Sequence, residues 1–120
     1  MDSPALAACR QQIERILTEH TRVPYAHGNV RIQTVFDRGA DRYLIMLVGW
    51  DGIRRVHGCL VHVDLIDGRI HIQRDGTEYG VARELTDAGV AKDMIVLAFR
   101  SAEAEPGGFA VPSVAAGTRG

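Results

Sequence analysis

Asp-Gly pairs recur through the middle of this sequence, each directly after a stretch rich in aliphatic and β-branched residues. They stand at Asp51-Gly52, Asp67-Gly68 and Asp75-Gly76. Asp-Gly favours the positive φ angles that two-residue hairpin loops require, so the first two pairs predict tight reversals between strands and the third predicts the end of the sheet. Strands joined in this way pair with their sequence neighbours. The centre of the chain is therefore predicted to be an antiparallel β-meander.

Four strands of this meander follow from the spacing of apolar residues. Residues 29–36 alternate apolar and polar side chains, which is typical of a half-buried strand. Residues 42–50 are apolar at almost every position, which favours a central strand covered on both faces. The third strand is predicted from residue 53 to 65 and the fourth from 69 to 73, one on each side of Asp67-Gly68.

Helices are predicted before and after the meander. In residues 3–21 apolar side chains recur at helical spacing, and Ser3 can cap the first turn. A shorter helix is predicted for residues 77–88, with Gly89 as its left-handed cap, and a fifth, buried strand for residues 95–99. The predicted fold class is thus α+β, with an N-terminal helix, a four-stranded antiparallel β-meander, a short helix and a fifth strand.

Size and charge limit the classes of partner. The chain has 120 residues, enough for one hydrophobic core, and its 14 Lys and Arg residues against 15 Asp and Glu residues give a formal net charge of -1. Without a basic excess we expect no direct high-affinity binding to nucleic acid. No apolar run approaches the roughly 20 residues that span a bilayer, and the N-terminus lacks a signal pattern. We therefore expect no membrane association and a cytoplasmic location.

One group of residues has the chemistry of a metal or acid–base site. Pairing across Asp67-Gly68 is predicted to set Asp64 opposite His71 and His62 opposite Gln73, so that His62, Asp64 and His71 share one face of the sheet. Two imidazoles and a carboxylate can hold a metal ion or transfer protons. A polar, solvent-facing sheet surface accounts for the same pattern. We adopt this second interpretation and assign no catalytic residue, metal or cofactor.

The chain lacks the residues of several common hydrolases. All three serines lie outside the predicted sheet, and no nucleophile elbow is present. Lys92 is the only lysine, and no carboxylate stands two residues before it, as a common type of nuclease centre would require. The sequence therefore favours a binding protein over an enzyme.

The predicted sheet carries more apolar residues than one short helix can cover. If the N-terminal helix covers one face, the other face is predicted to carry the surplus, which consists of Tyr43, Ile45, Leu47, Val56 and Leu60. Uncovered apolar patches of this kind commonly mark protein-binding surfaces.

A second partner-binding feature is predicted at the first hairpin tip, where Trp50 stands close to Arg54 and Arg55. Trp and Arg are enriched at the energetic centres of interfaces, although a Trp that stabilises the turn explains the same position. The predicted partner-binding set therefore comprises Trp50, Arg54, Arg55, Tyr43, Ile45 and Leu47.

Six motifs between residues 48 and 85 stand in a distinctive order: Val48-Gly49-Trp50-Asp51-Gly52, Arg54-Arg55-Val56-His57-Gly58-Cys59, His62-Val63-Asp64, Asp67-Gly68-Arg69-Ile70, Ile72-Gln73-Arg74-Asp75-Gly76-Thr77-Glu78 and Gly80-Val81-Ala82-Arg83-Glu84-Leu85. In order and spacing they resemble the XisI family, the fdxN-element excision controlling factors. The resemblance predicts a single XisI-like domain over residues 1–111 and a flexible tail over residues 112–120. The acidic stretch 101–107 departs from the family pattern.

This resemblance implies a non-enzymatic accessory factor for programmed excision of a DNA element, as in cyanobacteria. Such a factor would act in a complex with an XisH-like partner of endonuclease-like fold and with a site-specific recombinase. Two alternatives stay open, namely an antitoxin-like inhibitor of a nuclease-like partner and a small enzyme that uses His62, Asp64 and His71. The sequence leaves open whether the chain forms a homo-oligomer.

Overall fold

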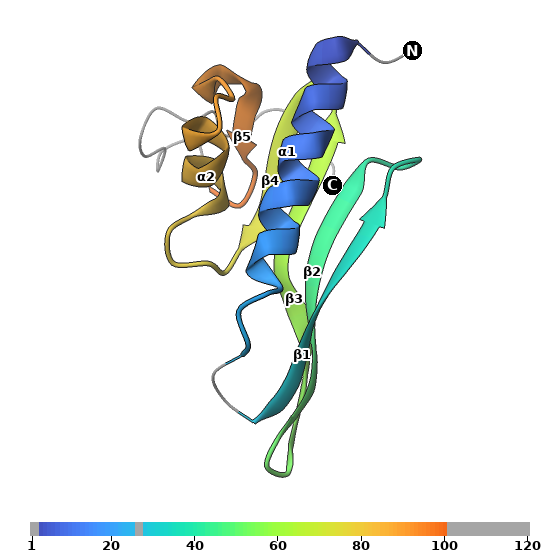
Figure 1. Ribbon diagram of the computed structural model, residues 1–120, viewed down its shortest axis with the longest axis vertical. Helices are drawn as coiled ribbons and strands as arrows, with labels where there is room; N and C mark the ends of the chain where they lie inside the picture. The colour runs from blue at the N-terminus through green and yellow to red at the C-terminus, as the bar shows by residue number, and fades with distance from the viewer. Residues whose placement is uncertain (1–2, 26–27, 101–120) are drawn as a thin grey trace.

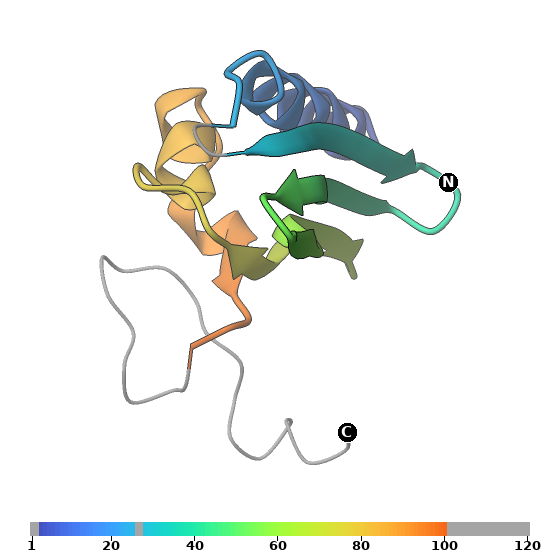
Figure 2. The same cartoon turned by 90° about the horizontal axis from the view of Figure 1, so that it is seen from below.

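A curved five-stranded sheet with two α-helices on its inner side makes up the structure, as Figures 1 and 2 show. The computed structural model describes residues 3–25 and 28–100. In chain order the elements are α1 (Pro4–His20), β1 (Asn29–Asp37), β2 (Arg42–Asp51), β3 (Arg54–Ile66), β4 (Arg69–Asp75), α2 (Val81–Asp87), a short 3-10 turn (Lys92–Met94) and β5 (Ile95–Leu97). The predicted α+β fold class is confirmed. The predicted tail over residues 112–120 lies outside the described residues.

Helix α1 begins where the sequence predicts. The backbone N–H of Leu6 donates a hydrogen bond to the Ser3 hydroxyl oxygen at 3.1 Å, which satisfies one of the free donors of the first turn. One stripe of the helix is buried against the sheet and consists of Cys9, Ile13, Ile16 and Leu17. Within residues 3–25 and 28–100, no helix is long and apolar enough to cross a membrane.

Strand order follows chain order from β1 to β5, as a meander predicts. β1 to β4 are antiparallel, whereas β5 pairs with β4 in parallel. The parallel pairing arises because the chain crosses over through α2 before it returns to the sheet. Two strand ends differ from the prediction by two residues, since β4 continues to Asp75 and β5 ends at Leu97, and the other ends that differ do so by one residue.

The two hairpin loops use their Asp-Gly pairs differently. Asp67 and Gly68 both have positive φ, 51° and 76°, and form the two-residue loop between β3 and β4 as predicted. In the β2–β3 hairpin, Asp51 pairs with Arg54, so the loop consists of Gly52 (φ 64°) and Ile53. The predicted Asp51-Gly52 loop is therefore wrong by one residue. The shift places Ile53 at the very tip.

Two β-bulges interrupt the ladders near the middle of the sheet. Ile45 and Met46 pair with Val61 and Cys59, which leaves Leu60 as an extra residue in β3. The carbonyl of Leu60 instead accepts the backbone N–H of Gly76 at 2.8 Å.

The second bulge corrects one predicted pairing. Asp64 lies opposite His71 as predicted, but His62 pairs with Arg74, and Gln73 is the extra residue in β4. The predicted pairing of His62 with Gln73 is therefore wrong. Bulges are not visible in a pattern of alternating residues, because the alternation assumes a regular ladder.

The hydrophobic core lies between the helices and the inner face of the sheet. Tyr43 and Ile45 belong to it, and both are completely buried. Their placement on a partner-binding face is therefore wrong. Val61, Val63, Ile70 and Ile72 belong to the same core and are also completely buried.

Helix α2 starts later than predicted, at Val81 instead of residue 77. The side chain of Asp75 spans the gap: Oδ1 accepts the backbone N–H of Thr77 at 2.9 Å, and Oδ2 accepts the backbone N–H of Val81 at 2.7 Å. The helix ends as predicted, with Gly89 at φ 102° and Val90 N–H donating to the Leu85 carbonyl at 3.0 Å.

Candidate functional site

The β2–β3 hairpin extends beyond the end of α1 and forms one end of the molecule (Figure 1). Its tip exposes two large apolar side chains: Ile53 is 99% exposed and Trp50 is 50% exposed. Burial of such side chains in a complex is favourable by roughly 25 cal/mol for each Å² of apolar surface that leaves water. The sequence predicts Trp50 at this tip but not Ile53, because the exposure of Ile53 depends on the one-residue shift of the loop.

Two arginines contact Trp50 or the residues beside it. The Arg55 guanidinium lies over the indole, 5.3 Å from the ring centroid, and its Nη1 donates to the Gly49 carbonyl at 3.3 Å. Arg54 Nη2 lies 3.8 Å from Asp51 Oδ2, with both side chains largely exposed. The geometry therefore brings Trp50, Arg54 and Arg55 together as the sequence predicts, and the stacking orders the ring in advance of any contact.

The outer face of the sheet, hereafter the open face, consists of the strand side chains that point away from α1. Tyr43 and Ile45 point inward, so the alternation of β2 places Leu44, Met46 and Val48 on the open face. All three are half-buried.

The residues expected on the uncovered face lie elsewhere. Leu47 pairs with Ile32 and Gly58 on the helix side of the sheet and is half-buried. Val56 is half-buried on that same side of β3. The prediction of an uncovered apolar face thus assigned the wrong set of alternating residues to it.

A small polar cluster lies on the open face around Asp64, which is 8% exposed. Its Oδ1 lies 3.0 Å from His62 Nε2 and 3.7 Å from Arg42 Nε, and its Oδ2 accepts a hydrogen bond from Gln73 Nε2 at 3.4 Å. His71 lies opposite Asp64 in the ladder, and burial lowers the pKa of its imidazole. A neutral His71 is therefore favoured at neutral pH.

This cluster does not have the arrangement of a metal site. Within the ranges 3–25 and 28–100, no three His, Cys, Asp or Glu side chains are grouped so that they could hold a metal ion. His62, Asp64 and His71 share a face, as predicted, but they do not converge on one point as ligands. The hydrogen bonds from His62 and Gln73 instead satisfy a carboxylate that the sheet has largely removed from water.

Cys59 lies on the open face next to this cluster and is partly exposed. Burial raises the pKa of its thiol, and the Sγ donates to the Val61 carbonyl at 3.2 Å. A raised thiol pKa disfavours the thiolate that nucleophilic catalysis needs.

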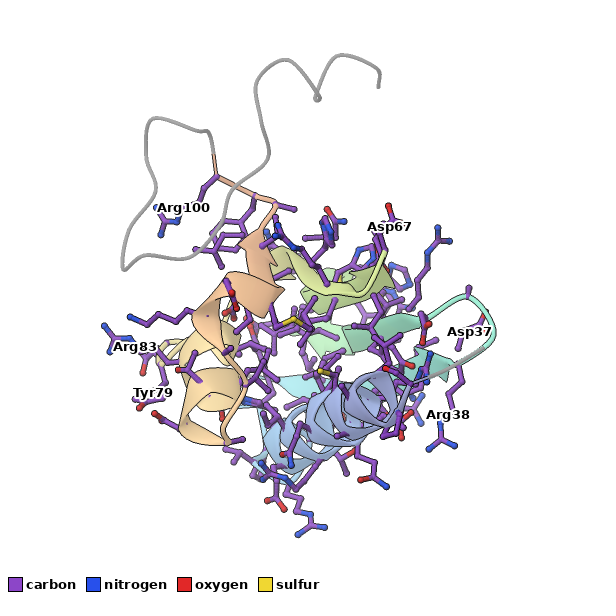
Figure 3. The ribbon with its side chains drawn as sticks, turned by 90° about the horizontal axis from the view of Figure 1, so that it is seen from above. Asp37, Arg38, Asp67, Tyr79, Arg83 and Arg100 are labelled. Atoms are coloured by element: carbon purple, nitrogen blue, oxygen red, sulfur yellow. The ribbon has the colours of Figure 1, made fainter. Side chains whose placement is uncertain are left out.

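A charged network that the sequence did not predict joins α1 to the β1–β2 turn. Arg38 donates from Nε and Nη2 to Glu14, with both distances 2.7 Å, and the Tyr43 hydroxyl donates to Asp41 Oδ1 at 2.8 Å. Figure 3 shows Arg38 at this turn. Burial and the neighbouring Asp41 carboxylate raise the pKa of Tyr43, so its hydroxyl remains a hydrogen-bond donor. The network positions the helix against the turn.

A sheet with one covered face, one open face and an exposed hairpin tip defines this chain as a small α+β domain of the helix-covered meander type. The chain belongs to the XisI family, since the family model described as XisI protein matches residues 1–111. The resemblance noted in the sequence motifs is thereby confirmed.

Two solved structures from Anabaena variabilis are similar to the chain. A XisI-like protein shares 28% sequence identity at a TM-score of 0.80, over 89% of this chain and 99% of that one. The fdxN element excision controlling factor XisI shares 26% identity at a TM-score of 0.70, over 82% of this chain and 96% of that one. The comparison with curated proteins gives no match.

Proposed function

We propose that this chain is a non-enzymatic regulatory protein of the cytoplasm that acts by forming a complex with a protein partner. The single observation that carries the proposal is the β2–β3 tip, where Ile53 is 99% exposed beside a half-exposed Trp50. A monomer gains no stability from an isoleucine in water, whereas a partner with a matching pocket gains from its burial. The solved relative named as an excision controlling factor supports a regulatory role.

The partner we propose is an XisH-like protein of endonuclease-like fold, with a site-specific recombinase as the enzyme whose action is controlled. Family membership supports this assignment, because the resemblance to excision controlling factors implies such partners. The order that Arg55 imposes on Trp50 also supports a binding role, since a fixed aromatic ring loses less side-chain entropy on association.

Co-expression with an XisH-like protein tests the proposal. The wild-type chain should co-elute with that protein in size-exclusion chromatography, and a double variant with Ile53→Ser and Trp50→Ser should not. Phe99→Ser serves as the control, because Phe99 is 46% exposed and follows β5, which lies at the other end of the molecule from the tip (Figure 1). Separate elution of the two wild-type proteins would refute the proposal, and co-elution of the double variant would show that the tip is not the contact.

A further inference from the structure

The open face carries most of the unpaired positive charge of the sheet, although the whole chain has a net charge of -1. Cross-strand pairing places five arginines on it: Arg31 opposite Val48, Arg55 opposite Trp50, Arg42 opposite Asp64, Arg69 two residues before His71, and Arg74 opposite His62. All five are exposed.

Few carboxylates balance these arginines. Among the described residues, the only ion pair that any of the five makes is between Arg42 and Asp64, with 3.7 Å between Nε and Oδ1. Asp37 and Asp67 lie at the turns that edge the sheet, as Figure 3 shows, and Asp37 Oδ1 already accepts the Ala40 backbone N–H at 3.1 Å.

By contrast, three carboxylates away from the open face each have a basic partner. Asp41 binds Arg10 at 2.6 Å, Glu14 binds Arg38 at 2.7 Å, and Glu84 lies 2.6 Å from His20. Charge is therefore distributed unevenly between the two sides of the molecule. The net charge hides a basic open face.

The middle of the open face is aliphatic. Leu44, Met46 and Val48 form a continuous row along β2, and both helices lie on the opposite side of the sheet (Figure 2). An apolar centre inside a polar rim in which arginine predominates is the composition of a protein-binding surface.

We infer that the open face binds a partner protein whose surface carries carboxylates around an apolar centre. The inference rests on the proposed function, because it names the chemistry of the partner. A second copy of the chain would bring two sets of arginines face to face, which opposes self-association. Nucleic acid would gain little from an aliphatic centre, because bases bind by stacking on aromatic rings, and Trp50 is the sole Trp, Tyr or Phe that pairing places on this face among the described residues.

Isothermal titration calorimetry with the purified XisH-like protein tests the inference. A double variant with Arg31→Glu and Arg69→Glu should weaken binding by at least about tenfold, since like charges replace complementary ones. The side chains of these two arginines make no hydrogen bond or ion pair with another described residue, so the substitutions break no such contact. A milder double variant, Arg31→Gln with Arg69→Gln, removes the two charges without reversing them. It should also weaken binding, and it keeps the test valid if the reversed charges perturb the fold.

The matched control is Arg15→Glu with Arg22→Glu, which changes the net charge equally but lies on and just after α1. This variant should bind within about twofold of wild type. Melting temperatures should show that all variants are folded.

Each other result overturns the inference. Unchanged binding by both open-face variants would refute the open face as the binding surface but would not affect the proposed regulatory complex. Failure of the wild type to bind would refute both proposals. A wild-type dimer in sedimentation that the open-face variants abolish would identify a second copy as the occupant. Steeply salt-dependent binding of a 20-nucleotide DNA that the same variants lose would identify nucleic acid.

Discussion

The guanidinium of Arg10 and the carboxylate of Asp41 meet through two hydrogen bonds, with Nε to Oδ1 at 2.6 Å and Nη2 to Oδ2 at 3.0 Å. The pair joins the first half of α1 to the turn before β2. The Tyr43 hydroxyl donates a third hydrogen bond to the same carboxylate from within the core. One acidic residue thus fixes α1, the turn and β2 relative to one another.

Replacement of this carboxylate should destabilise the fold without straining the backbone. Asp41 has φ 55°, a conformation that Asn also tolerates, so Asp41→Asn removes the charge but keeps the turn. We expect a loss of about 1.5 kcal/mol in the free energy of unfolding, the lower end for hydrogen bonds to charged groups, because both side chains retain some solvent contact. Urea denaturation measures the change. A stability equal to wild type would contradict the role of the pair.

The Asp41 carboxylate should also make the free energy of unfolding depend on pH in the acidic range. The Arg10 guanidinium holds the pKa of Asp41 below its usual 3.8, so between these two values the unfolded chain binds more protons than the folded one. The stabilisation is complete above about pH 4 and is lost as pH falls through the folded-state pKa. Wild type should therefore lose stability more steeply than Asp41→Asn below pH 4. Parallel curves for the two proteins would exclude the effect.

His71 should add a second pH dependence at higher pH. Burial lowers its pKa from 6.5, so as pH falls below 6.5 the unfolded chain takes up a proton before the folded chain does. Stability should decline from pH 6.5 down to the folded-state pKa and then level off. His71→Gln should remove this part of the curve, and chemical denaturation at several pH values compares the two proteins. A variant with the unchanged slope would assign the dependence to another group.

The corrected placement of β2 predicts different roles for two neighbouring aliphatic residues. Ile45 is completely buried, so Ile45→Ala should cost about 2–5 kcal/mol in the free energy of unfolding. Leu47 is half-buried beyond the bulge, so Leu47→Ala should cost less. Thermal and urea denaturation rank the two. Equal losses would show that the core extends further along the hairpin than the burial indicates.

Replacement by alanine should have opposite effects on stability at Gly89 and Gly58. Gly89 has φ 102°, which L-residues rarely adopt, so Gly89→Ala should destabilise the end of α2 by about 1–2 kcal/mol. At Gly58 an added Cβ meets nothing within 4 Å, and its φ lies outside the positive range. Gly58→Ala should therefore keep or raise stability, by up to about 1 kcal/mol, through the unfolded chain. Destabilisation at Gly58 as large as at Gly89 would contradict this comparison.

Local periodicity predicted the elements of this fold because each rests on interactions between near neighbours. The cap at Ser3 and the left-handed end at Gly89 depend only on adjacent turns of backbone, and both are confirmed. The start of α2 was not predictable in this way. It depends on the Asp75 side chain, whose carboxylate accepts the Val81 N–H and thereby fixes an irregular connection that no helical pattern describes.

The candidate site was predicted in part for similar reasons. Trp50, Arg54 and Arg55 are close in sequence and lie together at the tip. Tyr43 and Ile45 were assigned to the wrong face because a strand that is apolar at every position does not reveal which alternate set faces the helices. The basic open face was hidden for a different reason, since a net charge sums over all surfaces and carries no information on position.

The bulge at Leu60 also separates the domain into parts with different tolerance to sequence change. From residue 46 to residue 60 no side chain is fully buried, whereas the strands on the other side of the bulge supply much of the core. Truncation of side chains in this distal hairpin should therefore cost less than truncation in the core. Gly49 is an exception to this tolerance, because an added Cβ there would lie too close to the Asn29 carbonyl oxygen. The family motifs at residues 48–52 and 54–59 fall within this hairpin. Because packing of the core does not require most of these side chains, we expect the shared motifs to serve recognition of a partner.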